Sequence, residues 1–187
     1  MDPRLHVSLN DSSYDGWWTS TLESTDATTW PGLKTLSNVP DRRAYLHGGL
    51  GLLMDKQYYD GQLPESDGSH NVVGWFCRQH STPSGRIQLM FVFDQVRNFT
   101  QARFHVLNSL NYVAVFRRAL IQFSVGGQHF NRHHTPALLD VQRDIHNRQA
   151  RWVTVPLEHR VGRFLRITLW FDYDWIVLSE ISFDSSK

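Results

Sequence analysis

Hydrophobic and polar residues alternate along the second half of the chain in the pattern typical of β-strands. In residues 86–93, Ile87, Leu89, Phe91 and Phe93 fall on one face of an extended segment. Further apolar or alternating runs, separated by Gly, Pro, Asp and Ser turn signals, are found at 71–76, 101–107, 112–125, 151–157, 163–171 and 175–183. Helical periodicity is confined to one candidate turn at 50–55. The pattern therefore predicts an all-β sandwich or barrel.

The first third of the chain is organised differently. Residues 11–47 are rich in Ser, Thr, Asp and Gly, which predicts a long surface loop, and the same stretch carries Trp17, Trp18 and Trp30. Exposed tryptophans there would be a candidate contact loop, whereas tryptophans packed over one end of the sandwich would serve the fold alone. Residues 55–70 form a second polar stretch with turn signals.

Composition supports one folded domain over residues 1–187. The chain has 41% hydrophobic and 13% aromatic residues, which excludes a disordered chain. The net charge of +1 argues against a nucleic-acid binder held by phosphate contacts. The basic residues are unusual, because 16 of the 19 are Arg. We interpret these scattered arginines as parts of solvated strand faces.

Two groups of residues could carry metal or acid–base chemistry. His129, His133 and His134 have a spacing that holds zinc on a helix, but the neighbouring Gly and Pro residues favour a polar loop. The carboxylates of Asp172, Asp174 and Glu180 could form a glycosidase pair, but Asp172–Tyr173–Asp174 is more typical of a tight turn between strands. Calcium would suit such oxygen ligands better, although no EF-hand loop is present.

Three weaker signals complete the candidates. Residues 47–51 resemble an oxyanion loop only faintly, because no nucleophile elbow accompanies them. The single cysteine, Cys77, cannot form an internal disulfide and favours, on its own, a reducing compartment. Asn10 and Asn98 begin glycosylation sequons, but chance alone predicts about one sequon for this composition, so two are not evidence for secretion.

Several strings in the same order resemble the discoidin domain receptors, which are collagen-activated receptor tyrosine kinases. The most specific is the run Ile-Gln-Leu-Met-Phe-Val-Phe-Asp-Gln-Val-Arg-Asn-Phe-Thr at 87–100. Others are Asn-Asp-Ser-Ser-Tyr-Asp-Gly at 10–16, Gly-Gly-Leu-Gly at 48–51, Val-Gly-Trp at 73–75, Arg-Trp-Val-Thr-Val-Pro-Leu at 151–157 and Leu-Ser-Glu-Ile-Ser-Phe at 178–183. The resemblance covers nearly the whole chain and points to the second extracellular domain of these receptors.

The resemblance implies a discoidin-like jelly-roll β-sandwich, related to the F5/8 type C fold. It implies a structural calcium ion, held by the matching positions Asp55, Ser179, Glu180 and, less firmly, Asn10. It also implies that both sequons fall on positions matching the family and that the domain sits outside the cell. That location reverses the inference drawn from Cys77.

The chain departs from the family at three places. Leu52 replaces a glutamine ligand, so we expect a modest calcium site or none. The two cysteines of the family's disulfide align with Ile121 and Ile167, a paired change expected of two residues in contact. The segment from Gly16 to Gly48 is longer than in the family, which makes the tryptophan-rich stretch an insertion.

The function implied is that of a non-catalytic extracellular module in a collagen-receptor-tyrosine-kinase-like protein. It would position the preceding discoidin domain and contribute to receptor regulation. It would contact collagen only indirectly, bind no nucleic acid and be tethered to the plasma membrane through the parent chain. The alternative is a free-standing carbohydrate- or matrix-binding sandwich whose ligand site is formed by loops 17–30 and 128–136.

Overall fold

The computed structural model describes residues 14–17, 34–35, 53–54, 56–59, 73–76, 85–109, 113–130, 135–144 and 146–186, and side chains from residue 53 onward except at 73 and 76. Eight strands lie in this part of the chain: β1 (Tyr14–Trp17), β2 (Lys34–Thr35), β3 (Val73–Phe76), β4 (Arg86–Val106), β5 (Arg118–Ser124), β6 (Ala137–Asp140), β7 (Arg151–Trp170) and β8 (Trp175–Ser186). No helix within these ranges has the length and apolar character needed to cross a membrane.

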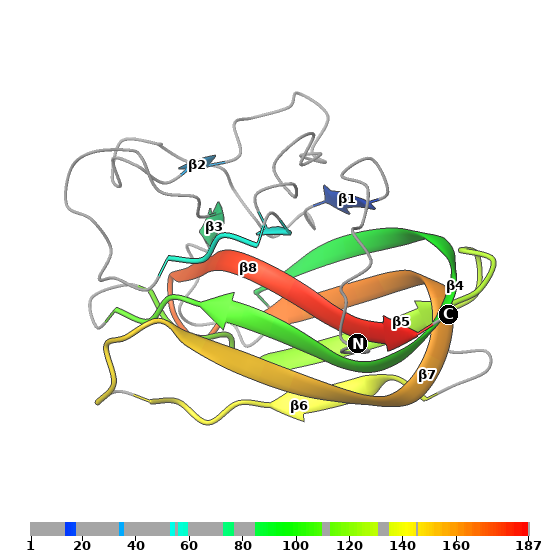
Figure 1. Ribbon diagram of the computed structural model, residues 1–187. Coiled ribbons are helices and arrows are strands. Elements are labelled where there is room, and N and C mark those ends of the chain that lie inside the picture. Colours follow the sequence, from blue (N-terminus) through cyan, green and yellow to red (C-terminus); the bar gives the residue numbers. More distant parts are fainter. Residues whose placement is uncertain are drawn as a thin grey trace.

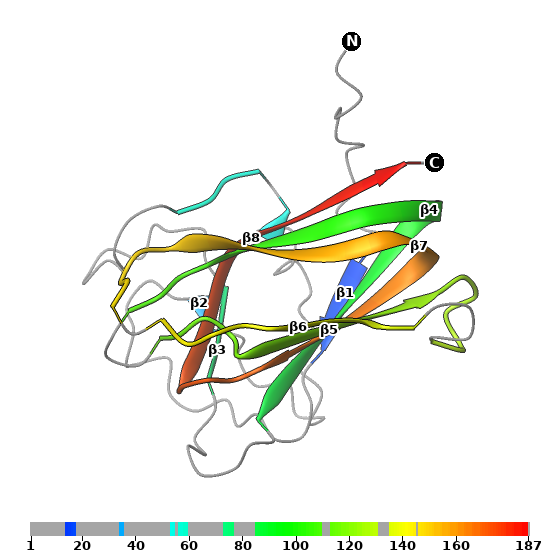
Figure 2. The same ribbon diagram turned by 90° about the horizontal axis from the view of Figure 1, so that it is seen from below.

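The strands form one continuous hydrogen-bonded path that folds into two layers (Figures 1 and 2). The order is β2-β3-β8-β4-β7-β5-β6, and β1 pairs separately with β4. In one layer, residues 86–92 of β4 pair with 164–170 of β7, which continue to β5 and β6. In the other, residues 97–106 of β4 pair with both β8 and the first half of β7. The expected all-β sandwich is confirmed.

β4 and β7 belong to both layers because each strand bends at irregular positions. The register between them shifts between Val92 and Arg97 and again between Phe99 and Gln101. On β7, Glu158 and His159 have φ values of 49° and 60°, a left-handed conformation that non-glycine residues seldom adopt. Such bulges bend a strand and increase its twist, so each strand can leave one layer and enter the other.

The core lies between the two layers and follows the predicted alternation. Ile87, Leu89, Phe91 and Phe93 are all at most 2% exposed, which confirms the face predicted for residues 86–93. Aromatic rings join the layers: the Phe91 and Phe183 centroids are 5.1 Å apart in an edge-to-face arrangement. Each such pair adds about 0.5–1.5 kcal/mol to the contribution of its buried area.

Three features differ from the sequence prediction. The runs at 86–93 and 101–107 are one strand, as are those at 151–157 and 163–171, because the polar residues between them lie in bulges instead of loops. The loop prediction for 11–47 is wrong at β1 and β2, which pair with β4 and β3 through backbone hydrogen bonds that need no apolar alternation. The four-residue strand β6 was not predicted, since it is short and at the edge.

Ile121 and Ile167 lie directly opposite one another on β5 and β7, and both are fully buried. The expectation that these positions form a contact pair is therefore confirmed. Directly opposed residues of antiparallel strands have Cβ atoms about 4.5–5.5 Å apart, close to the spacing that a disulfide spans.

We expect the double variant Ile121→Cys, Ile167→Cys to form a disulfide under oxidising conditions. The closed loop should raise the free energy of unfolding by about 2–4 kcal/mol relative to the reduced form of the same variant. Thermal melts with and without reductant measure this difference. The single variant Ile121→Cys is the control and should not respond to reductant. A double variant that stays reduced in oxidising buffer would contradict the pairing.

His159 offers a test of the bend in β7. Replacing it by glycine removes a side chain from a left-handed position, so His159→Gly should stabilise the domain by about 0.5–1 kcal/mol. Thr154→Gly, at an exposed position of the same strand without a positive φ, should instead destabilise it by about 0.5–1 kcal/mol. Urea titration of both variants checks the sign, and equal losses would show that the bend carries no strain.

Candidate functional site

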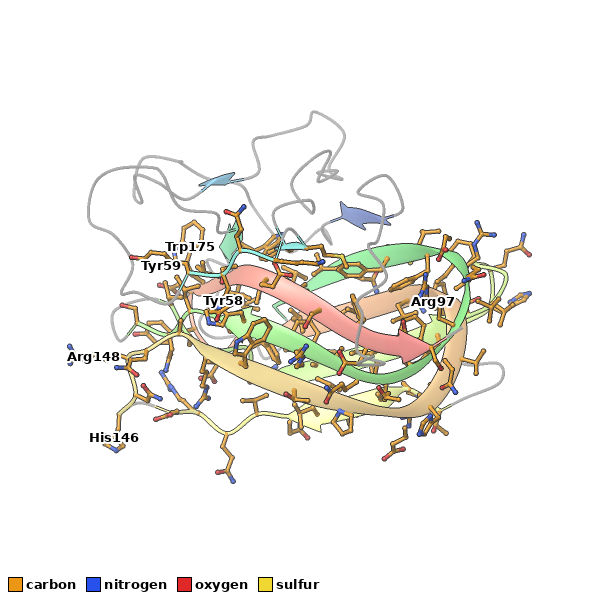
Figure 3. All side chains as sticks on the ribbon, viewed as in Figure 1. Tyr58, Tyr59, Arg97, His146, Arg148 and Trp175 are labelled. Carbon is orange, nitrogen blue, oxygen red and sulfur yellow. The ribbon has the colours of Figure 1, made fainter. Side chains whose placement is uncertain are left out.

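The two ends of the sandwich are built differently. Figure 3 shows Tyr58, Tyr59, Trp175, His146 and Arg148 gathered at one end and Arg97 at the opposite end, near the end of β8. The first end, called here the loop end, is formed by residues 107–109, 113–117, 141–144, 146–150 and 171–174 between the strands, together with residues 56–59. Loops held by a rigid scaffold are the usual carriers of function in such folds.

A small second core supports the loop end. It consists of the buried side chains of Leu107, Val113, Trp175 and Val177, with Tyr59 and Ala150 packed against it. Backbone hydrogen bonds from the Leu107 N–H to the Val177 carbonyl, at 3.0 Å, and from the Ala114 N–H to the Trp175 carbonyl, at 3.2 Å, join these segments. The loop end therefore has its own packed base, which holds the loops above it in fixed positions.

A row of side chains crosses the outer face of three strands beside this base. Trp152 on β7, His105 on β4 and Glu180 on β8 are direct cross-strand partners. His105 is only 1% exposed because the more exposed rings of Tyr58 and Trp152 cover it, with centroids 5.0 and 4.9 Å from the imidazole. The Arg103 guanidinium lies 5.7 Å from the Trp152 ring, a cation–π arrangement.

Ser179 lies where β8 departs from regular pairing. The pairing of β3 ends opposite Leu178, and the register with β4 passes from Leu178 to Glu180 without a partner for Ser179. Its hydroxyl lies 2.6 Å from His105 Nδ1 and accepts a hydrogen bond of 3.3 Å from the Tyr59 N–H. The hydroxyl is therefore engaged, and a bulged residue of this kind can turn its carbonyl away from the ladder.

Two of the four positions implied for calcium lie side by side in the structure. Ser179 is fully buried and Glu180 is 5% exposed, so both residues lie away from solvent. A backbone carbonyl and a carboxylate are oxygen donors of the kind that calcium prefers. Asp55, Asn10 and Leu52 lie outside the described residues. Within the part that the structure describes, no three His, Cys, Asp or Glu residues group as a metal site.

The acidic turn predicted at the C-terminal side is confirmed. Asp172, Tyr173 and Asp174 lie in the turn that joins β7 to β8, and Asp172 pairs with Arg143 at 3.3 Å. Glu180 lies on the outer face of β8, opposite His105. The turn therefore accounts for the clustering of these aspartates in the sequence.

The sequon at Asn98 lies within a strand. Asn98 pairs with residues of both β7 and β8, and its side chain is half-buried. Thr100 is exposed, and its hydroxyl donates a 3.2 Å hydrogen bond to the Asp184 carbonyl. Glycosylation of Asn98 stays a prediction, at a position less accessible than the surface loops where sequons are usually modified.

Several other predicted residues lie partly or wholly outside the described part of the chain. His129 is exposed in the segment after β5, but its proposed zinc partners are not described. Trp17 is the last residue of β1 and pairs with Gln88 through its backbone, while its side chain is not described. The positions without a structural description are Asn10, Trp18, Trp30, residues 47–51, Leu52, Asp55, Cys77, His133 and His134.

Sequence reasoning missed the cluster of Tyr58, His105 and Trp152. The three residues are far apart in the chain, and each is unremarkable in its own segment. The one available signal was Trp152, which interrupts the polar face of the alternating run at 151–157. Grouping them requires the strand order β8-β4-β7, which alternation alone does not give.

Comparison with solved structures gives matches at low sequence identity. The Streptococcus pneumoniae β-galactosidase BgaA matches with a TM-score of 0.49 at 12% identity, covering 94% of this chain and 99% of that one. A carbohydrate-binding module from a Clostridium perfringens family 31 glycoside hydrolase matches with a TM-score of 0.43 at 12% identity, covering 74% and 98%.

Comparison with curated proteins gives receptor relatives. The chain is 28% identical to the discoidin domain-containing receptor tyrosine kinase B of Caenorhabditis elegans over 99% of its own length and 20% of the relative. It is 29% identical to the epithelial discoidin domain-containing receptor 1 of Rattus norvegicus over 96% of its length and 18% of the relative. The chain thus spans about a fifth of these relatives.

The family match is direct and extends over most of the chain. Residues 38–185 match the family described as "Discoidin domain-containing receptor 1/2, DS-like domain". The chain therefore belongs to the discoidin domain-containing receptor family, in which it corresponds to the DS-like domain.

Proposed function

We propose that this chain is a non-catalytic module on the extracellular side of a membrane-tethered receptor tyrosine kinase, where it positions the preceding discoidin domain. The observation that carries this proposal is the match of residues 38–185 to the DS-like domain of these receptors. Collagen would bind the preceding domain directly and would contact this module only indirectly. The kinase would lie in another part of the parent chain.

The architecture supports a positioning role. β4 and β7 run through both layers and are paired with each other along almost their whole length. The layers therefore cannot slide past one another without breaking backbone hydrogen bonds in the middle of both strands. A module of this kind transmits an orientation, whereas a flexible linker of similar span does not.

In the full-length receptor, we expect replacement of this module by a Gly/Ser linker to uncouple binding from signalling. Collagen binding at the cell surface should persist, because its main site lies in the preceding domain. Collagen-stimulated tyrosine phosphorylation should fall to the unstimulated level, because the linker no longer fixes the orientation of that domain. Cell-surface collagen binding and phosphotyrosine immunoblotting measure the two effects.

A receptor carrying an unrelated rigid β-sandwich in place of this module is the matched control. Partial recovery of phosphorylation would support a spacing role. Normal signalling by the linker variant would contradict the proposal, as would tight collagen binding by the isolated 187-residue chain in a solid-phase assay.

We also propose a modest structural calcium site at Asp55, Ser179 and Glu180, with Asn10 as a further ligand. Support comes from the adjacent, buried Ser179 and Glu180. When bound, calcium would supply positive charge beside the Glu180 carboxylate. Leu52 provides no oxygen, so the affinity should resemble that of the weaker extracellular modules, with a Kd of about 10⁻⁴–10⁻³ M.

We expect 2 mM calcium, compared with chelator, to raise the melting temperature by about 1–6 °C through preferential binding to the folded state. Leu52→Gln should enlarge this shift by restoring a side-chain oxygen, and Glu180→Gln should abolish it. Differential scanning calorimetry measures all three proteins. A wild-type shift far above this range would show that Leu52 does not weaken the site, and no shift in either wild type or Leu52→Gln would contradict the site.

A further inference from the structure

Two arginines on β7, Arg163 and Arg166, are held in place without a carboxylate partner. Six other arginines in the described part of the chain pair with an aspartate or glutamate: Arg97, Arg103, Arg118, Arg143, Arg151 and Arg160. Within the same part, Arg163 and Arg166 instead contact neutral oxygen atoms and aromatic rings. Neutral acceptors fix the position of a guanidinium but do not neutralise its charge. The two side chains therefore remain open to an anion from outside the chain.

Arg166 lies on the outer face of the layer that contains β5, β6 and the second half of β7 (Figure 2). Its neighbours Leu165 and Ile167 are fully buried in the core, so alternation directs Arg166 outward. The Nε–H group donates a 2.9 Å hydrogen bond to Gln122 Oε1, and the centroid of the Phe130 ring lies 4.1 Å from Cζ. These contacts fix the guanidinium and leave its two terminal nitrogens without a partner among the described residues.

The charge of Arg166 is only partly solvated. Its side chain is half-buried, and burial lowers the pKa of the guanidinium below its usual value. A cation in this position has lost part of its hydration, and no carboxylate of the described residues compensates that loss. An anion bound here would restore favourable interactions that burial removed, which distinguishes Arg166 from a fully solvated surface arginine.

Arg163 provides a second cation at the border of the same site. Its Nε–H group donates to a backbone carbonyl at 3.0 Å, and its Cζ lies 5.4 Å from the centroid of the Phe164 ring. Phe164 shares the outer face with Arg166, and Gly127 packs so closely on the Phe164 ring that a Cβ atom there would lie 3.1 Å from it. Gly127 and Phe130 thus bring the segment after β5 down onto this face and give the site a fixed border.

The remaining side chains of this face determine which kind of anion fits. Leu138 on β6 is 56% exposed and lies directly opposite Leu120 on β5. On the same two strands Arg118 and Asp140 pair with one another, so a long polyanion lying along the face would meet the exposed Asp140 carboxylate. A single carboxylate with apolar neighbours avoids this repulsion. Arginine and aromatic side chains, which border this position, are enriched where proteins bind proteins.

We propose that this face binds a protein partner through one aspartate or glutamate of that partner, which Arg166 receives with its two terminal nitrogens. Such paired, charge-assisted hydrogen bonds are the strong ones in protein recognition. Leu120 and Leu138 would contact apolar residues beside the carboxylate, and Arg163 would attract it from the border. Because Gln122 and Phe130 already hold the guanidinium, little of its freedom remains to be lost on binding. The site lies away from the loop end and does not depend on the receptor role.

The test uses the complete 187-residue chain and two blocked tripeptides, acetyl-Leu-Asp-Leu-amide and its uncharged match acetyl-Leu-Asn-Leu-amide. Each is titrated to about 20 mM while NMR records the backbone amide and arginine Nε–H signals, a range that detects a Kd of about 1–10 mM. We expect the aspartate peptide to give saturable shifts at the Arg166 Nε–H and the Phe130 amide. The asparagine peptide should bind about tenfold more weakly, because it lacks the charge that strengthens the hydrogen bonds.

Variants separate the contact from a general effect of charge. Arg166→Gln should weaken binding of the aspartate peptide about tenfold, and Arg166→Lys, which keeps the charge but not the planar fork, about threefold or more. Arg148→Gln, at an exposed position of the loop end, removes the same charge and should leave binding unchanged. Thermal melts confirm that each variant is folded, and Arg166→Lys keeps the test independent of the loss of charge at this position.

Three outcomes would overturn the proposal. They are the absence of saturable shifts with the aspartate peptide, equal binding of the two peptides, and binding that Arg166→Gln does not weaken. A heparin hexasaccharide is the competing probe. If it bound at least about tenfold more tightly than the aspartate peptide, lost affinity with salt and required both Arg163 and Arg166, the face would belong to sulfated chains instead. Failure of peptide binding would leave the linker-replacement result in the receptor unaffected, so the two proposals fail separately.

Discussion

The structure depends on two strands that belong to both layers. β4 and β7 pair with each other before and after their bends, so the same backbone ladder closes both halves of the sandwich. The bends bring Phe93, Phe99 and Phe183 together, with the Phe93 centroid 4.8 and 5.5 Å from the other two. Opening one layer would therefore expose this cluster and break the ladder of the other, which makes the sandwich a single mechanical unit.

Irregular strand pairing determines which residues meet near the loop end. If β8 paired regularly with β4 throughout, Ser179 would occupy a ladder position and alternation would shift every later side chain to the other face. The bulge keeps Glu180 opposite His105 while Ser179 remains buried beside both. Bulges are common beside sites because they re-aim single residues without disturbing the strand. The candidate cation position depends on this one extra residue.

Alternation was sufficient to predict the β fold and the core face of 86–93, because period-two burial is a local property. The pairing of Ile121 with Ile167 followed from the family resemblance, which carries three-dimensional information. The meeting of Arg143 with Asp172 could not be predicted, since they lie on different loops whose proximity depends on the whole strand order. The bends of β4 and β7 escaped prediction because polar residues in a bulge have the same composition as those in a loop.

Two arginines hold the bends of the long strands in place. Arg160 donates from Nε to the Thr135 carbonyl at 2.7 Å and from a terminal nitrogen to the Leu157 carbonyl at 3.0 Å, joining the segment before β6 to the bend of β7. Arg163 donates to the Phe93 carbonyl at 3.0 Å, joining the bends of both long strands. A planar guanidinium can bridge two backbone segments at fixed angles, whereas a lysine ammonium is a flexible point charge. These two arginines brace the bends, and Arg163 is at the same time an exposed strand residue, as expected from the scattered distribution of the arginines. At these two bends the guanidinium groups are directed at the chain's own backbone, so arginine serves here as a structural residue.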